Sequence, residues 1–323
     1  MGSVQPPQPI LYVAAGARTA TRPCTGRRVR DTGGMVFRSG FACFVGRPNA
    51  GKSTLTNALV GIKVAITSSK PQTTRHTIRG IVHREDGQLI LIDTPGLHRP
   101  RTLLGQRLND LVRGTLSEVD LVLQLVDAAA GVGAGDRFLA AELARVDTPK
   151  LCVVNKIDAA SRAKTAAALA DFAEIVPVSA RSGEQLDLLV ELVLRHLPEG
   201  RPLYPEGHTS DEPEQHLVAE LIREKALAVV REELPHSVAV LVEEMGPDPE
   251  REDLLVIRAF LFVERASQKP IVVGKGGSVL RDIGTRARAE LEALFGTQVY
   301  LDLRVKVAKE WQRDPRQLSR LGF

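Results

Sequence analysis

The segment Gly46-Arg-Pro-Asn-Ala-Gly-Lys-Ser-Thr54 constrains the fold of this chain more than any other stretch of the sequence. It has the spacing G-x-x-x-x-G-K-[ST], follows the apolar run Phe41–Val45, and leads into a helical pattern at 52–60. Glycine at both ends lets the backbone turn its N–H groups inward, and the helix N-terminus adds partial positive charge. The segment therefore predicts a phosphate-binding loop. The alternative, an ordinary glycine turn, is disfavoured by the strand and helix around it.

Individual residues of this loop suit separate roles toward a phosphate. Lys52 can reach the β- and γ-phosphates, and the hydroxyl of Ser53 suits a Mg²⁺ ligand. We expect contacts with a nucleotide from the whole loop, namely Gly46, Arg47, Pro48, Asn49, Ala50, Gly51, Lys52, Ser53 and Thr54.

Length and composition indicate a globular protein of two domains. The chain has 323 residues, 43% of them hydrophobic, which supports sizeable cores. No apolar run is long enough for a membrane-spanning helix. The three cysteines, Cys24, Cys43 and Cys152, are isolated from one another, which favours a reducing compartment and argues against a disulfide framework or structural zinc.

The basic character of the chain comes from its first 38 residues. They carry six arginines and one aspartate, a net of +5, which leaves −1 of the total of +4 for residues 39–323. The overall charge is therefore no evidence of nucleic-acid binding. The leader, 1–38, is rich in Pro, Gly, Ala and Arg, which favours disorder. A true start at Met35 is the interpretation that we prefer, and an organellar transit peptide is an alternative.

From Gly40 to about Pro198, short apolar runs alternate with helical patterns, which predicts a doubly wound, mostly parallel α/β sheet. Ligands of such sheets bind beyond the carboxyl ends of the strands. The expected strands are 41–45, 78–83, 89–92, 121–126, 151–154 and 175–178, and the expected helices lie near 52–60, 102–117, 136–146, 160–172 and 184–197.

Three further motifs lie at strand ends, in the order that a guanine-nucleotide site requires. Asp93 can hold Mg²⁺ through water, and the N–H of Gly96 can meet the γ-phosphate. The Asp158 carboxylate can accept two hydrogen bonds from guanine that adenine cannot donate, which gives about 100-fold or greater discrimination. A backbone N–H at 179–180 can reach guanine O6. The motifs predict a GTP site, and their residues are Asp93, Thr94, Pro95, Gly96, Leu97, Asn155, Lys156, Ile157, Asp158, Ser179 and Ala180.

The polar segment Pro71-Gln-Thr-Thr-Arg75 lies between the glycine loop and Asp93. A threonine here can bind Mg²⁺ only while the γ-phosphate is present, which would make the segment an order–disorder switch. We prefer Thr74 for this role, with Thr73 open as the alternative. The expected metal ligands are therefore Ser53, Thr74 and Asp93.

Two positions concern hydrolysis. Leu97 stands where many GTPases place a water-positioning glutamine, so intrinsic hydrolysis is expected to be slow or to use another device. Asn49 is a candidate ligand for a monovalent cation such as K⁺ near the β/γ bridge, and a turn-forming role is the alternative. The residues assigned to catalysis are Lys52, Thr74, Gly96 and Asn49.

A second domain is predicted after the Pro- and Gly-rich stretch 199–213. It contains a helix from about Leu217, strands at 238–242, 254–263 and 299–307, and the turn Gly274-Lys-Gly-Gly277 before a helix at 278–295. A G-x-x-G turn clamps a nucleic-acid backbone in KH domains. Residues 265–323 hold twelve bases and six acids, against five bases and fifteen acids in 205–264, so positive charge surrounds the turn. A solvated surface with a flexible turn is the alternative.

These motifs in this order make the chain resemble the Era family of GTPases, in which a G domain precedes a type II KH domain. The similarity runs from about Ser39 to Lys306. The resemblance implies that an apolar residue at Leu97 is normal. It also implies a helix at 270–273 despite the strand propensity there, and binding of the 3′ end of 16S rRNA to assist small-subunit assembly. The implied RNA contacts are Gly274, Lys275, Gly276, Gly277 and Arg281, with base readout on the strand 254–263.

The prediction is a cytoplasmic, monomeric GTPase that uses GTP/GDP, Mg²⁺ and a K⁺ ion, with nucleotide state gating RNA affinity. Peripheral membrane association is implied by the family alone. Three rival functions are a P-loop kinase of small molecules, which Asn155–Asp158 argues against, a GTP-binding structural module, and a tRNA-modifying GTPase. The expected units are the leader 1–38, the G domain 39–200, the linker 201–213, the KH domain 214–310 and a basic C-terminal tail 311–323.

Overall fold

The structure is a computed structural model that describes residues 36–68, 70, 73–97, 100, 102–161, 174–230 and 237–323. The leader, apart from its last three residues, lies outside the described residues. The same holds for Pro71, Gln72 and nearly all of the helix expected at 160–172. None of the described helices is both long and apolar enough to cross a bilayer.

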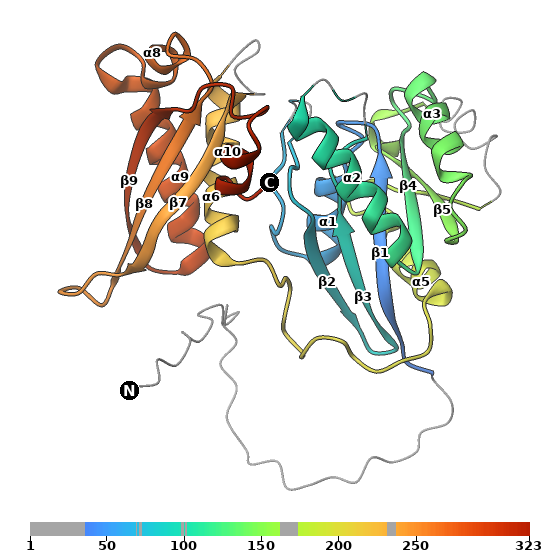
Figure 1. The fold of residues 1–323 in the computed structure, drawn as a ribbon. Coiled ribbons are helices and arrows are strands. Elements are labelled where there is room, and N and C mark those ends of the chain that lie inside the picture. Colours follow the sequence, from blue (N-terminus) through green and yellow to red (C-terminus); the bar gives the residue numbers. More distant parts are fainter. Residues whose placement is uncertain are drawn as a thin grey trace, which may run out of the picture.

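Six strands form the sheet of the first domain, in the order β2-β3-β1-β4-β5-β6 (Figure 1). All neighbouring strands are parallel except the edge pair β2 and β3. The expected doubly wound, mostly parallel sheet is therefore confirmed. The strands are β1 (Arg38–Gly46), β2 (Ile78–Arg84), β3 (Gly87–Asp93), β4 (Leu121–Asp127), β5 (Lys150–Asn155) and β6 (Ile175–Pro177).

Helices cover both faces of this sheet. Leu55 of α1 (Lys52–Val60) and Leu189 of α5 (Leu186–His196) belong to the core on one face. On the other face, α2 (Leu103–Glu118) and α3 (Ala134–Leu143) pack against β1, β3 and β4. A sheet covered on both sides needs strands that are buried throughout, and every residue of β3 is buried. The carboxyl ends of the parallel strands then meet at one edge, where the nucleotide motifs lie.

The second domain has a three-stranded sheet in the order β7-β8-β9, with β7 and β8 antiparallel and β8 and β9 parallel. Helices α6 and α9 pack against one of its faces (Figure 1). The α+β order expected of a type II KH domain is confirmed. Its elements are α6 (Glu214–Val229), β7 (Ala239–Pro247), β8 (Leu254–Val263), α8 (Gln268–Val273), the 3₁₀ turn η2 (Lys275–Gly277), α9 (Ser278–Phe295) and β9 (Gln298–Val307).

The apolar run at 270–273 lies in helix α8, as the family topology predicted and the local strand propensity did not. Pro270 is the third residue of this helix. Proline is tolerated in a first helical turn, where its missing N–H would have no partner within the helix. The run is also short, and four apolar residues cannot be assigned to helix or strand by periodicity.

The segment expected as a linker, 201–213, is pinned along the edge of the first sheet. The side chain of Gln88 bonds the backbone of Leu203 and Tyr204, and the N–H of Ile81 donates to Thr209 O (2.9 Å). The chain thereby covers part of the exposed edge strand β2 before it enters α6 (Figure 1).

The segment 311–323, which its charge suggested to be a basic tail, forms the short helix α10 (Pro315–Arg320) and joins the two domains. Trp311 is fully buried, and its indole N–H donates to Ser237 O (3.0 Å). It shares an apolar cluster with Leu104 and Leu108 of α2 and with Phe260 of β8. The C-terminus accordingly lies between the domains in Figure 1.

Candidate nucleotide and RNA sites

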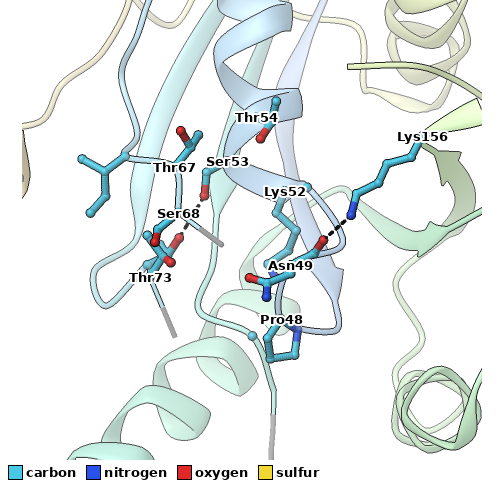
Figure 2. A pocket seen from close by; sticks show the side chains of 13 residues that line it. Pro48, Asn49, Lys52, Ser53, Thr54, Thr67, Ser68, Thr73 and Lys156 are labelled. Carbon is cyan, nitrogen blue, oxygen red and sulfur yellow. Dashed lines mark hydrogen bonds between the residues drawn. The ribbon is translucent and has the colours of Figure 1, made fainter. Parts of the chain in front are cut away.

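A pocket of about 530 Å³ lies beyond the carboxyl end of β1 (Figure 2). Gly51 adopts a left-handed conformation there (φ 97°), and a Cβ at this position would fall 2.4 Å from Asn155 Nδ2. Only glycine therefore fits the start of α1. The pocket is lined by Pro48, Asn49, Gly51, Lys52, Ser53, Thr54, Ile66, Thr67, Ser68, Thr73, Thr74, Gly96 and Lys156.

Within the glycine loop, the two basic side chains take different directions. Lys52 is buried, and its Nζ donates to Gly46 O (3.2 Å) and Arg47 O (3.4 Å). Burial lowers the pKa of Lys52, and the nearby Asp93 carboxylate opposes that shift. Arg47 instead donates through Nε to Asp136 Oδ1 (2.9 Å) on α3. The guanidinium of Arg47 thus ties the loop to α3, so only the backbone of Arg47 can contact a phosphate.

Three oxygen ligands expected for Mg²⁺ come together at the mouth of the loop. Ser53 Oγ donates to Asp93 Oδ2 (2.6 Å) and lies 3.0 Å from Thr74 Oγ1, which is 3.3 Å from the same carboxylate oxygen. The hydroxyl of Thr73 donates instead to Lys70 O (2.7 Å). Of the two threonines left open by the sequence, the structure brings Thr74 to this cluster.

The residues of this cluster fit a Mg²⁺ ion. Asp93 is fully buried, and its Oδ1 has no hydrogen-bond partner among the described residues. Burial raises the pKa of Asp93, although the Lys52 charge and the hydroxyls of Ser53 and Thr74 oppose the shift. A cation would satisfy the orphaned oxygen. One carboxylate with two hydroxyls suits Mg²⁺, which shares its remaining positions with phosphate and water.

The segment after β3 places Gly96 at the wall of the pocket and Leu97 in the core. Gly96 is buried at the wall of the pocket, where a Cβ would meet Pro48 at 3.3 Å. Thr94 donates through Oγ1 to Phe44 O (2.6 Å), which fixes the turn, and Pro95 is buried beside it. Leu97 packs against the core under α2 and α3 and does not line the pocket. An apolar side chain held in this way cannot orient a water molecule.

The residues expected to recognise guanine lie together at the ends of β5 and β6. Asn155 donates through Nδ2 to Ala50 O (3.0 Å), which ties this region to the glycine loop. Lys156 donates through Nζ to Asn49 O (2.7 Å) and to Asp127 Oδ2 (2.6 Å). Figure 2 shows the first of these bonds. Ile157 packs into a small apolar cluster and is therefore structural.

Asp158 is exposed, and its Oδ1 accepts a hydrogen bond from Ser179 Oγ (2.7 Å). The N–H of Ala180, which the sequence suggested for guanine O6, donates to Asn155 Oδ1 (3.0 Å). These two contacts orient the Asp158 carboxylate and the Asn155 amide. The sequence had not assigned this positioning role to Ser179 and Ala180.

The pocket wall formed by Ile66, Thr67 and Ser68 was not predicted from the sequence. These residues follow α1 in a loop without a motif. Ile66 is buried in the apolar cluster of the second domain, and the N–H of Thr67 donates to Glu224 Oε1 of α6 (2.8 Å). Their position depends on a contact between distant parts of the chain, which no local pattern reveals.

The glycine turn before α9 has a left-handed backbone that favours glycine. Gly274, Gly276 and Gly277 all have positive φ, of 74°, 59° and 78°. A Cβ at Gly274 would lie 2.6 Å from Val279 Cγ2. Lys275 and Arg281 are exposed, and neither forms an ion pair within the described part of the chain. Both cations and the N-terminus of α9 are therefore available to an anion.

The strand β8, where base readout was expected, has only part of its outer surface open. Phe260 and Phe262 lie under Trp311 and Leu318 of the C-terminal segment. Lys306 Nζ stands 3.1 Å above the ring of Phe260. The residues nearer the start of β8, among them the exposed Arg258, are the ones accessible to a base.

These features define a P-loop GTPase domain joined to a KH domain. They are the glycine loop with its Mg²⁺-type oxygen cluster, the pair of guanine-type motifs, and the glycine turn on an α+β domain. Residues 41–156 match the family "50S ribosome-binding GTPase", and residues 233–312 match the family "KH domain". GTPase Era of Mycobacterium sp. (strain KMS) is 60% identical over 296 residues, which are 89% of this chain and 99% of that protein. The chain belongs to the Era family of GTPases.

Two solved structures agree with this assignment. One is Era in complex with MgGDPNP and nucleotides 1506–1542 of 16S ribosomal RNA; it is 40% identical, with a TM-score of 0.86, over 88% of this chain and 99% of that one. The other is a point variant of Aquifex aeolicus Era bound to GDP·AlF₄⁻; it is 39% identical, with a TM-score of 0.85 and the same coverage. The chain is accordingly a GTPase.

Proposed function

We propose that this GTPase binds the 3′ end of 16S rRNA through its KH domain and assists assembly of the small (30S) ribosomal subunit, with nucleotide state gating its RNA affinity. The observation that carries the proposal is the contact of the pocket wall with the KH domain. Ile66 and Thr67 belong to the GTP pocket, and both touch α6 or its core. A ligand that reorders this wall changes a surface of the RNA-binding domain.

In the proposed GTP-bound state, Ser53, Thr74 and Asp93 would together hold Mg²⁺. The ion would supply positive charge where negative charge develops between the β- and γ-phosphates. Lys52 binds the same phosphates, and the N–H of Gly96 meets the γ-phosphate. Without the γ-phosphate, Thr74 would lose its place beside Ser53 and Asp93, and the segment Thr73–Thr74 would be released.

The RNA contacts are assigned to the turn Gly274–Gly277. Its backbone approaches a ribose-phosphate chain closely because it carries almost no side chains, while Lys275 and Arg281 supply positive charge. The family description names the large subunit. We favour the small subunit because a relative that is 40% identical forms a complex with 16S RNA.

The test is the affinity of the full chain for a labelled RNA of the 16S 3′ end, measured by fluorescence anisotropy with GDPNP or GDP. We expect the two affinities to differ, and equal affinities would reject the gating. Lys275→Ala should weaken binding, whereas Lys150→Ala, the same change at an exposed lysine of the G domain, should not. Equal effects of both substitutions would show that only net charge matters and would reject the glycine turn as the clamp.

For the hydrolysis step, we propose that Asn49 binds a monovalent cation near the β/γ bridge, since Leu97 cannot position water. Asn49 lines the pocket and has a left-handed backbone (φ 65°). Turnover of GTP should be faster in K⁺ than in Na⁺ at equal ionic strength, and Asn49→Ala should remove the difference. Identical rates of the unsubstituted protein in both salts would exclude a cation site.

The cytoplasmic location, the peripheral contact with a membrane and the monomeric state stay predictions from the family resemblance. Flotation of the protein with anionic vesicles tests the membrane contact. Sedimentation equilibrium tests the monomer.

A further inference from the structure

Both ends of the loop that carries Thr74 are attached to one turn of a helix in the other domain. At one end, the N–H of Thr67 donates to Glu224 Oε1 (2.8 Å). At the other end, Arg223 donates through Nη2 to the carbonyl oxygen of Thr73. Arg223 and Glu224 are consecutive residues of α6. The G domain therefore does not set the position of this loop alone.

The Arg223 contact is built for rigidity. The side chain is 2% exposed, and its guanidinium pairs with Glu220 through two bonds, Nε to Oε1 (2.7 Å) and Nη2 to Oε2 (2.6 Å). Burial would raise the pKa of Glu220, but the charge and hydrogen bonds of Arg223, with His76 and Arg75 nearby, hold that pKa below its usual range. A planar guanidinium fixed in this way directs the second N–H of Nη2 toward the Thr73 carbonyl.

We propose that Arg223, supported by Glu220, is a positioning residue for GTP hydrolysis that acts through Thr74. The carbonyl that it holds belongs to the Thr73–Thr74 peptide unit, which is planar and trans. Fixing this carbonyl fixes the plane from which the Thr74 side chain leaves the backbone. The Thr74 hydroxyl then stands 3.0 Å from Ser53 Oγ in the Mg²⁺-type cluster. The KH domain thereby completes the active site of its neighbour.

The test compares the full-length protein with the double variant Arg223→Met/Glu220→Gln, which removes the guanidinium without leaving a buried carboxylate unpaired. We expect kcat to fall about tenfold, as for the loss of one hydrogen bond to a charged group. The Mg²⁺ concentration for half-maximal turnover should rise. Affinity for GDP should not change, because GDP does not hold Thr74 in place.

A matched control is Arg107→Met. Arg107 also donates from one domain to a main-chain oxygen of the C-terminal segment, Phe323 O (2.5 Å), and this hydrogen bond does not involve Thr73 or Thr74. This variant should keep the normal kcat and Mg²⁺ requirement. A normal kcat in the double variant would overturn the inference. So would a loss of GDP affinity as large as the loss of kcat, because that result indicates a merely structural role.

The inference rests on the proposed role of Thr74, and Thr74→Ala separates the two. If Thr74→Ala hydrolyses GTP normally, the proposed role of Thr74 fails. If Thr74→Ala is impaired and the double variant is not, only the role of Arg223 fails. Should the double variant not fold, Arg223→Lys serves instead, since an ammonium keeps the buried charge but cannot form the two-bond pair and hold the carbonyl in one plane. A normal kcat in that variant overturns the inference equally.

Discussion

Ile66 is the residue whose truncation most directly tests the contact between the nucleotide pocket and the KH domain. Its side chain is 1% exposed, and it belongs to the apolar cluster that Val218 and Ile222 of α6 form with Val242 of β7. It also lines the pocket. We predict that Ile66→Ala lowers the free energy needed to separate the two domains and leaves each domain folded.

The expected magnitude follows from burial. Truncation of a fully buried isoleucine to alanine costs about 2–5 kcal/mol, where the larger values apply to rigid cavities. Ile66 lies between two domains that can close partly over the gap, so the lower part of the range applies, about 2–3 kcal/mol. This corresponds to a roughly 30- to 150-fold shift toward the separated state.

The assay uses the single tryptophan of the chain. Trp311 stacks on Phe323 with 5.7 Å between ring centroids, and the guanidinium of Arg75 lies 5.5 Å from its ring centroid. Arg75 belongs to the G domain, so separation of the domains exposes Trp311 to water and shifts its emission to the red. The urea midpoint of this emission change should fall in Ile66→Ala. Circular dichroism reports separately on unfolding, because a two-domain chain need not unfold in one step.

The matched control is Ile62→Ala, four residues earlier in the same loop. Ile62 is 40% exposed, so its truncation should change stability by about 0.5 kcal/mol or less. The reasoning is refuted if Ile66→Ala moves the Trp311 midpoint no further than Ile62→Ala. It is also refuted by the following combination of results. In Ile66→Ala the Trp311 emission change and the loss of the circular dichroism signal occur at the same urea concentration, whereas in the unsubstituted protein they occur at different concentrations.

Three further predictions concern the site and the interface. Burial would raise the pKa of Glu224, but the hydrogen bonds of Lys225, Lys63 and the Thr67 N–H lower it. The contribution of Glu224 to stability is therefore complete above the pKa of an unfolded glutamate, and it is lost as the pH falls through the folded pKa. The Trp311 midpoint should therefore fall on acidification below about pH 4.3, and less steeply in Glu224→Gln. Asp158→Asn should weaken GTP binding about 100-fold and admit xanthosine triphosphate, whose C2 oxygen accepts from the new amide, as nucleotide competition would reveal. Gly51→Ala should abolish nucleotide binding in a fluorescent-GDP titration, because its Cβ would fall 2.4 Å from Asn155 Nδ2 at φ 97°.

The nucleotide site could be predicted because each motif follows a buried strand, and parallel strands end at one edge. Local spacing therefore predicts that Lys52, Asp93 and Asn155 lie at this edge, and the prediction needs no tertiary contact. Thr73 and Thr74 could not be separated in this way, since they have the same chemistry and adjacent positions. Only the tertiary course of the loop sends one hydroxyl to Lys70 O and the other to Ser53.

The contacts between the domains lay beyond the sequence for a different reason. Arg223 and Thr73 are 150 residues apart, and an arginine near a glutamate on a helix is usually a solvated pair. The segment 311–323 was misleading because its arginines dominate its charge. The position of this segment is set instead by Trp311, Leu318 and Leu321, which are buried against β8 and α2. The charged residues of the segment remain at the surface, in contact with water.

The interface also places a thermodynamic constraint on gating. Lys63 of the G domain pairs with Glu224 on α6 and with Glu290 on α9, at 2.6 Å each, and α9 begins directly after the glycine turn. The loop that carries the pocket wall is thus attached to α9, the helix that begins at the glycine turn Gly274–Gly277. If GTP and GDP give RNA affinities that differ by some factor, linkage requires bound RNA to change the preference for GTP over GDP by that same factor. RNA would then act on the Thr74 loop through the contacts by which the nucleotide acts on RNA. A gating measured in one direction but absent in the other would mean that the two ligands do not bias a common two-state element.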